Sequence, residues 1–208
     1  MCDVEKFRFV TPCSVILGGP SRAGKTEFAK TLIKHHTLLF DKEIKEIYYV
    51  YVYEQPFFTD FPEVTFTREL PVNLDASRRS LLIVDDCLAQ RKRLAEVSKF
   101  FVATSHHLDC SIFLITQNIF ESDPFYRTLS LNATALVIFR SARNAHQIRV
   151  LSRQLFADNS LLFEVFKDAT RKPYSYLLID LSQSCSQKFR LRARILPHES
   201  PEIVYETE

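Results

Sequence analysis

Glycine is scarce in this chain. The 208 residues include three glycines, whereas average usage of about 7% would give roughly 15. All three (Gly18, Gly19 and Gly24) lie in one short window. Glycine is the residue that lets a backbone adopt positive φ angles or approach another group closely. We therefore expect a close backbone contact in this window.

Other features are also missing, and each absence argues against a class of protein. No apolar run approaches the roughly 18 residues needed to span a bilayer, and the N-terminus lacks the apolar segment of a signal peptide. The five cysteines are scattered singly, without a C-x-x-C pair. This pattern argues against a disulfide framework or a zinc knuckle and fits thiols in a reducing compartment. We expect an intracellular protein with no membrane partner.

The composition that remains is typical of a soluble globular domain, with 46% hydrophobic and 25% charged residues. The length suits one domain of ordinary size. We found no internal repeat, low-complexity block or linker. The prediction is a single domain over residues 1–208, with a core from about 13 to 181. Residues 182–208 are expected to form a C-terminal strand and an acidic tail.

Charge is unevenly distributed, although the net charge is only +2. Four arginines between Arg140 and Arg153 have no acidic residue among them, and cations alternate from Lys188 to Arg194. The last ten residues carry four glutamates and no lysine or arginine. A basic C-terminal half that ends in an acidic tail predicts a polarised surface.

Short, fully apolar runs alternate with helical patterns along the chain. Four such runs predict buried strands: 14–17, 81–84, 112–115 and 135–139. Further strands are predicted over 44–53, near 64–66, over 174–181 and over 189–195, and helices over 25–39, 91–105, 145–156 and 161–166. Uninterrupted apolar strands are typical of a parallel sheet covered on both faces. The predicted fold is therefore α/β, with a central, mostly parallel sheet flanked by helices in three layers.

The glycine window contains a phosphate-binding motif. Residues 19–26 match G-x-x-x-x-G-K-[ST], between a predicted strand and a predicted helix. Backbone N–H groups in such a loop cradle phosphate oxygens, the lysine reaches the β- and γ-phosphates, and the hydroxyl binds Mg²⁺. This motif predicts a P-loop NTPase with ATP and Mg²⁺ as cofactors, and we expect the fold to be of the RecA-like (ASCE) type. The predicted nucleotide-binding residues are Gly19, Pro20, Ser21, Arg22, Ala23, Gly24, Lys25, Thr26 and Glu27.

Polar residues at the carboxyl ends of neighbouring strands complete a hydrolytic site. Asp85 and Asp86 follow one buried strand, and Gln117 follows the next. A carboxylate at a strand end can hold Mg²⁺, so Asp85 is predicted to bind the metal together with Thr26. Asp86 is predicted to activate the attacking water. Gln117 is expected beside the γ-phosphate, where an amide can position that water.

Two arginines are candidates for a residue supplied to a neighbouring subunit. Arg140 and Arg143 follow the buried run 135–139, and an arginine acting in trans can stabilise charge during phosphoryl transfer. The sequence does not distinguish between them. The pair His106 and His107, near Asp109, lacks a fourth ligand, so we interpret it as a polar helix end rather than a metal site.

The order of these motifs resembles a known family. Residues 19–26, LLIVDD at 81–86 and SHHLDCSIFLITQNIF at 105–120 are similar to the genome-packaging ATPases of double-stranded DNA viruses. More narrowly, they resemble those of adintoviruses and Maverick/Polinton elements, within the FtsK–HerA superfamily. Further similarity in SLNA, LVIFR and NAHQIR extends the resemblance over about residues 13–156.

This resemblance implies an ATP-driven motor that translocates double-stranded DNA into a preformed capsid. Such motors form homo-oligomeric rings, pentamers or hexamers, with the nucleotide between subunits and DNA through the centre. A viral capsid vertex is then a partner, and the host nucleus or a virus assembly site is the expected location. The resemblance assigns nucleotide binding to Lys25 and Thr26, Mg²⁺ to Asp85, water activation to Asp86, and coupling to Gln117. Related motors often have Glu where this chain has Asp86.

Other functions remain open from the sequence. A cellular-type DNA translocase or helicase, a small P-loop nucleoside or nucleotide kinase, and a non-catalytic nucleotide switch share the phosphate loop. Gln117 favours hydrolysis over phosphoryl transfer to an acceptor, and the acidic pair Asp85–Asp86 argues against a simple switch. Three basic segments are candidates for DNA contact: 78–79, 91–93 and 188–194.

Overall fold

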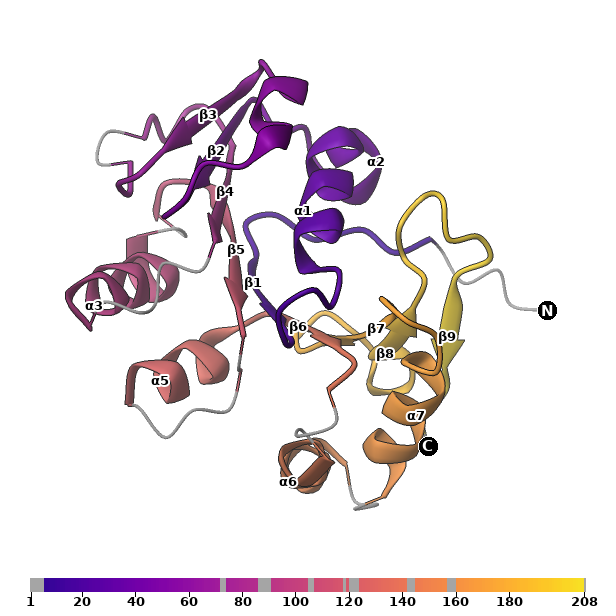
Figure 1. The fold of residues 1–208 in the computed structure, drawn as a ribbon. Coiled ribbons are helices and arrows are strands. Elements are labelled where there is room, and N and C mark those ends of the chain that lie inside the picture. Colours follow the sequence, from indigo (N-terminus) through magenta and orange to yellow (C-terminus); the bar gives the residue numbers. More distant parts are fainter. Residues whose placement is uncertain are drawn as a thin grey trace.

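A nine-stranded sheet forms the centre of the molecule in the computed structural model (Figure 1). The model describes residues 6–71, 74–85, 91–104, 107–117, 119, 124–141, 145–156 and 160–207. The strand order is β3-β2-β4-β5-β1-β6-β7-β8-β9. The pairs from β3 to β6 are parallel, and the pairs from β6 to β9 are antiparallel. The strands are β1 (Ser14–Gly18), β2 (Glu46–Val50), β3 (Val64–Thr67), β4 (Ser80–Asp85), β5 (Cys110–Thr116), β6 (Ala135–Phe139), β7 (Tyr176–Asp180), β8 (Leu191–Ala193) and β9 (Ile203–Tyr205).

Helices cover both faces of this sheet. Two α-helices and a short 3-10 helix pack on one face, and the remaining α-helices pack on the other. The first group comprises α1 (Lys25–Lys34), α2 (His36–Leu39) and η1 (Pro56–Asp60), and the second comprises α3 (Arg91–Lys99), α5 (Pro124–Asn132), α6 (Ala145–Leu155) and α7 (Leu161–Ala169). A π-helix, η3 (Phe100–Thr104), continues α3, and a 3-10 helix, η4 (Gln187–Phe189), precedes β8.

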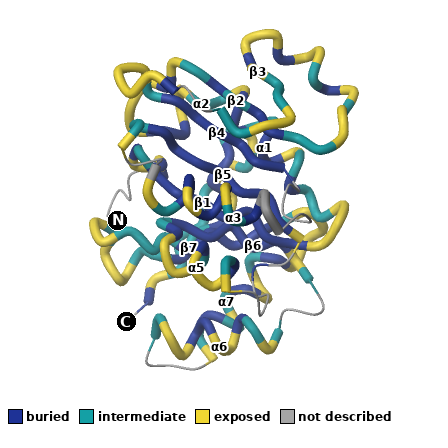
Figure 2. The backbone as a smooth tube through the Cα atoms, turned by 90° about the vertical axis from the view of Figure 1, so that its left-hand side faces the viewer, coloured by how far each residue is buried: buried dark blue, intermediate teal, exposed yellow. Residues whose placement is uncertain are grey.

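The central strands are apolar because both of their faces are buried. Every residue of β1, β4, β5 and β6 is buried. In β1, Val15 and Leu17 join the cluster under α1, whereas Ile16 joins the cluster under α3, α5, α6 and α7. Figure 2 shows this buried centre with exposed segments around it. The predicted three-layer α/β fold with a mostly parallel sheet is confirmed.

Several predicted boundaries were wrong. The helix expected over 25–39 divides at His35, whose φ of −120° is not helical. The helix expected over 91–105 ends as the π-helix η3, and the strand expected over 44–53 is limited to β2. Helix α5 and strand β9 were not predicted. The strand β9 is short and has a glutamate on each side, so its apolar residues did not form a recognisable strand pattern.

The acidic tail is folded against the basic strand rather than separated from it. Arg192 of β8 pairs with Glu202 at 2.6 Å, and Lys188 pairs with Glu206 at 3.1 Å. Strand β9 lies beside β8 in antiparallel register. The polarised surface expected from the sequence is therefore largely neutralised at this end of the chain. Within the part of the chain that the structure describes, no helix has the length and apolar character to cross a membrane.

Candidate nucleotide-binding and hydrolytic site

The phosphate loop connects the end of β1 to the start of α1. Its backbone has positive φ at Arg22 (62°) and Gly24 (108°). A Cβ on Gly19 would lie 2.7 Å from the Cβ of Phe139, which is closer than side chains approach. Positive φ and close packing are the conditions that only glycine meets without strain. The glycine window is therefore explained by the shape of this loop.

Lys25 lies inside the loop that it follows. Its Nζ donates hydrogen bonds to the carbonyl oxygens of Gly19 at 2.6 Å and Pro20 at 2.8 Å, and the residue is 8% exposed. A buried ammonium group needs such acceptors because desolvation of a charge is costly.

Asp85, the last residue of β4, is buried and held by two side chains. Its Oδ2 accepts a hydrogen bond from the Tyr49 hydroxyl at 2.6 Å and another from the Gln55 amide at 3.2 Å. Tyr49 is itself fully buried on β2. Donors that hold one carboxylate oxygen fix its orientation, as outer partners of metal ligands do.

A cavity of about 230 Å³ lies on one side of the loop, and sequence-predicted residues, among them Asp85 and Gln117, line it. Asp85 comes from β4, Gln117 directly follows β5, and both face the loop residues across this cavity. The remaining lining comes from the end of β5 and from the segment after β2. The cavity is lined by Ser21, Arg22, Lys25, Thr26, Tyr51, Val52, Tyr53, Gln55, Asp85, Ile115, Thr116 and Gln117.

The segment that carries Gln117 is packed directly on the start of the loop. Gly18 pairs with Thr116 in the β1–β5 ladder, and the Gly19 N–H donates to the Thr116 carbonyl at 3.2 Å. A Cβ on Gly18 would lie 2.0 Å from Cγ1 of Ile119, which is 3% exposed. Gly18 therefore leaves the space that Ile119 occupies and keeps the segment after β5 close to the loop.

A larger cavity of about 490 Å³ lies on the other side of the loop, along α1. Its walls combine aromatic and apolar groups with a few polar side chains. They are Arg22, Gly24, Lys25, Thr26, Glu27, Phe28, Thr31, Phe139, Tyr174, Tyr176, Leu196, His198 and Glu199. Tyr174 is 70% exposed and has a φ of 63°. An exposed aromatic ring beside a phosphate loop provides a surface on which a nucleobase can stack.

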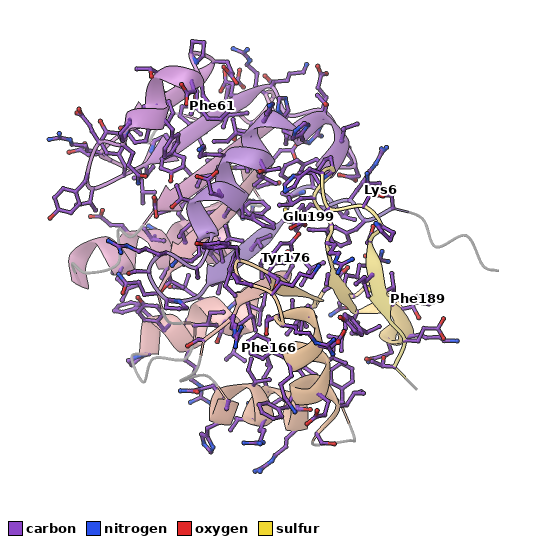
Figure 3. The ribbon with its side chains drawn as sticks, turned by 45° about the vertical axis from the view of Figure 1, so that its right-hand side comes forward. Lys6, Phe61, Phe166, Tyr176, Phe189 and Glu199 are labelled. Carbon is purple, nitrogen blue, oxygen red and sulfur yellow. The ribbon has the colours of Figure 1, made fainter. Side chains whose placement is uncertain are left out.

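The far wall of this larger cavity is held by a partly buried hydrogen bond between two separate segments of the chain. The Tyr176 hydroxyl on β7 donates to Oε2 of Glu199, and the two side chains point toward each other in Figure 3. Glu199 also accepts from the Leu196 N–H. Burial, together with the Glu199 carboxylate, raises the pKa of Tyr176 well above its usual value. Tyr176 therefore stays protonated and keeps the segment 195–199 against the cavity.

Among the described residues, the sequence-predicted Arg140 does not line the space around the loop. Arg140 follows β6 and donates a hydrogen bond to the Arg171 carbonyl at 3.2 Å, and it lines neither cavity described above. Asp86, Arg143 and His106 lie outside the described residues. Asp109, near His107, pairs with Arg79 at 2.8 Å.

Sequence reasoning missed the residues that surround the predicted ones. Tyr49 was assigned only to the strand predicted over 44–53, and Gln55 to no predicted element. Tyr174 and His198 reach the larger cavity from positions far along the chain. No motif marks these residues, because their roles depend on which strands become neighbours.

Comparisons with known proteins show a likeness of the fold to solved structures. No family model matches the sequence, and no curated protein matches it. The structure does resemble the genome-packaging NTPase B204 of Sulfolobus turreted icosahedral virus 2 in complex with sulfate. The TM-score is 0.55 and the identity 14%, over 94% of this chain and 96% of that chain.

Two further B204 structures show the same likeness. The complex with AMPPCP has a TM-score of 0.54 and 15% identity, over 95% of this chain and 98% of that one. B204 of Sulfolobus turreted icosahedral virus, described as a DNA-packaging ATPase, has a TM-score of 0.51 and 14% identity, over 98% and 99% of the two chains. At this identity the likeness establishes a shared P-loop NTPase fold and nothing finer.

Proposed function

We propose that this protein is an ATP-hydrolysing motor that translocates double-stranded DNA and packages it into a viral capsid. The observation that carries the hydrolytic part is the smaller cavity, where Lys25, Thr26, Asp85 and Gln117 meet. These residues supply a cation for phosphate, two oxygen ligands and an amide. This is the set needed to bind and hydrolyse a nucleoside triphosphate.

Each residue of the cavity has a separate task in this proposal. The loop N–H groups and Lys25 bind the β- and γ-phosphates and stabilise the charge that develops during phosphoryl transfer. Gln117 orients the attacking water toward the γ-phosphate, and Asp86, just after Asp85 in sequence, accepts its proton. The products are ADP and inorganic phosphate.

The residues present fit a Mg²⁺ ion. Thr26 and Asp85 line one cavity, and both offer the hard oxygen donors that Mg²⁺ prefers. When bound, Mg²⁺ neutralises phosphate charge. Thr26 and Asp85 would hold it on the side of the loop that faces Gln117. Tyr49 and Gln55 keep the Asp85 carboxylate turned toward that position.

The larger cavity fits the nucleoside part of ATP. It adjoins the loop at Gly24 and Lys25, so phosphates in the loop and a base in this cavity belong to one ligand. Tyr174 offers a stacking surface and Leu196 an apolar wall. The polar side chains of Thr31 and His198 remain to contact the ribose or the base edge.

The packaging part of the proposal is supported by the resemblance in sequence motifs and by the fold shared with B204. It implies a homo-oligomeric ring on a capsid vertex, with duplex DNA through its centre. Arg140 or Arg143 would then act on the nucleotide of a neighbouring subunit. An intracellular virus assembly site follows as the location.

The test is steady-state ATP hydrolysis with and without long duplex DNA, at two salt concentrations, with Lys25→Ala as the blank. The motor proposal expects DNA to stimulate turnover and salt to weaken that stimulation, since phosphate contacts release counterions. Turnover that is unaffected by DNA, with transfer of the γ-phosphate to an added nucleoside or nucleotide, would instead identify a kinase.

A further inference from the structure

Two of the basic segments that the sequence offers for DNA contact are 78–79 and 188–194, and four of their six cations have acidic partners. Arg78 pairs with Glu46 at 2.7 Å, and Arg79 pairs with Asp109. In the segment 188–194, Lys188 and Arg192 pair with Glu206 and Glu202. A cation that already neighbours a carboxylate attracts a polyanion less strongly. The side chains of the third segment, 91–93, lie outside the described residues.

A different stretch is basic without any acidic residue. From residue 124 to residue 156 the chain contains five arginines and no aspartate or glutamate. This stretch includes α5, β6 and α6. Any carboxylate that compensates this positive charge must therefore come from another part of the chain.

Helix α6 brings part of this charge to one exposed stripe. Ile148, Leu151 and Ser152 are buried against the rest of the domain. The exposed residues His146, Arg149 and Arg153 recur at helical spacing on the opposite side. In Figure 2, α6 lies at the lower end of the molecule.

Arg149 is oriented without being neutralised. Its guanidinium lies 4.0 Å from the centre of the Phe163 ring on α7. A cation–π contact holds the position of an arginine but leaves its charge and its hydrogen-bond donors available. Among the described residues, no carboxylate lies within 4.0 Å of Arg149 or Arg153.

We infer that this exposed side of α6 (His146, Arg149 and Arg153), here called the α6 stripe, contacts the phosphate backbone of duplex DNA. The inference rests on the proposed motor function and assigns it a contact surface. From His146 to Arg153 the stripe is about 10 Å long at 1.5 Å per residue, enough to reach more than one phosphate. Arginine forks bind phosphate oxygens in a bidentate manner. Such contacts read no base edges, as a packaging motor requires.

The decisive experiment measures binding of a fluorescent 40-base-pair duplex by anisotropy across a series of salt concentrations. Arg149→Gln and Arg153→Gln should each lower the slope of log affinity against log salt by about 1. Arg153→Lys keeps the charge and should keep most of the slope. Arg68→Gln is the matched control, because it removes one charge from an arginine already paired with Glu54.

Folding and assembly are checked in the same samples. Arg153 lies in the last turn of α6, where a cation also favours the helix dipole, so thermal unfolding is recorded for each variant. An unchanged salt slope in both glutamine variants would overturn the inference about the α6 stripe. If DNA still stimulated ATP hydrolysis in that case, the motor proposal would stand. Loss of oligomer with an unchanged slope would assign the α6 stripe to a subunit contact. Absence of DNA binding in the unmodified protein would reject the motor proposal itself.

Discussion

Asp85 is oriented by two residues that no motif identifies. The Tyr49 hydroxyl and the Gln55 amide donate to the same carboxylate oxygen. The aromatic ring of Tyr49 is packed among Phe57, Phe58 and Phe66, with ring centroids 5.7–5.8 Å apart. Because this packing fixes the Tyr49 ring, its hydroxyl donates in a fixed direction, toward Oδ2 of Asp85. Tyr49 is therefore a positioning residue for the proposed metal ligand.

We predict that Tyr49→Phe weakens Mg²⁺ binding while it leaves metal-free nucleotide binding intact. Loss of an outer hydrogen bond to a metal ligand typically costs about 10-fold or more in metal affinity. The measurement is calorimetric titration of ADP at several Mg²⁺ concentrations. Tyr48→Phe is the matched control, because the Tyr48 hydroxyl bonds to Glu46, a residue that lines neither cavity at the phosphate loop. Equal Mg²⁺ dependence in the two variants would contradict this role for Tyr49.

Gly18 offers a test of the link between the loop and Gln117. Gly18→Ala should destabilise the fold by about 1–3 kcal/mol, as overpacking does, and reduce ATP turnover, because Ile119 must move away. Chemical denaturation and kcat are the measurements. Shortening the clashing side chain in Gly18→Ala/Ile119→Ala should recover part of both losses. A double variant no better than Gly18→Ala would show that the contact is not the cause.

At the scale of elements, the tail from β8 to β9 adds the last two strands to one edge of the sheet and supplies part of the wall of the larger cavity. Arg192 and Glu202 form an ion pair with side chains only 11% and 13% exposed, and Glu202 also accepts from the Phe7 N–H at 3.1 Å. Removal of one partner from such a pair leaves a buried charge without compensation. The pair Lys188–Glu206, by contrast, is more than half exposed at both ends.

These two pairs give a prediction with an internal control. Glu202→Gln should lower the free energy of unfolding by about 3 kcal/mol, because the largely buried Arg192 would lose the charge of its carboxylate partner. Glu206→Gln should change it by less than about 0.5 kcal/mol, as surface pairs contribute little. Urea unfolding measures both. Similar losses in the two variants would mean that the tail is held by something other than this buried pair.

At the scale of the whole molecule, the arginine proposed to act in trans remains a prediction. Within one chain Arg140 supports the Arg171 carbonyl, close to Tyr174 in the larger cavity. An arginine with this contact either shapes its own subunit or, on assembly, reaches the nucleotide of the next one. The two roles differ in how mixed assemblies behave.

Mixing variants distinguishes these roles. Subunits with Arg140→Ala keep an intact phosphate loop, and subunits with Lys25→Ala keep the arginine. If Arg140 acts across a boundary, neither variant alone should hydrolyse ATP well, and their mixture should regain part of the activity. Activity of the mixture that equals the average of the two variants would place Arg140 in its own subunit. Arg143→Ala is tested in the same way.

Local sequence was sufficient wherever chemistry and backbone shape lie in one continuous segment. Residues 19–26 specify the phosphate loop because the loop needs positive φ at Gly24, close packing at Gly19 and a lysine at its end. The apolar runs of β1, β4, β5 and β6 determined a sheet buried on both faces, since such strands are stable only when covered on each side. Residues at the ends of these strands therefore met at one edge.

The tertiary structure alone decided which side chains surround those residues. Tyr49 reaches Asp85 because β2 pairs with β4, and the Tyr176–Glu199 contact exists because the tail returns along β8. The sequence showed which charged residues the C-terminal half contains, but not which cation pairs with which carboxylate. Electrostatic neutralisation depends on distances of a few ångströms between residues far apart in the chain. Only the fold sets those distances: among the described residues, Arg192 of β8 has a carboxylate partner, whereas Arg149 and Arg153 of α6 have none within 4.0 Å.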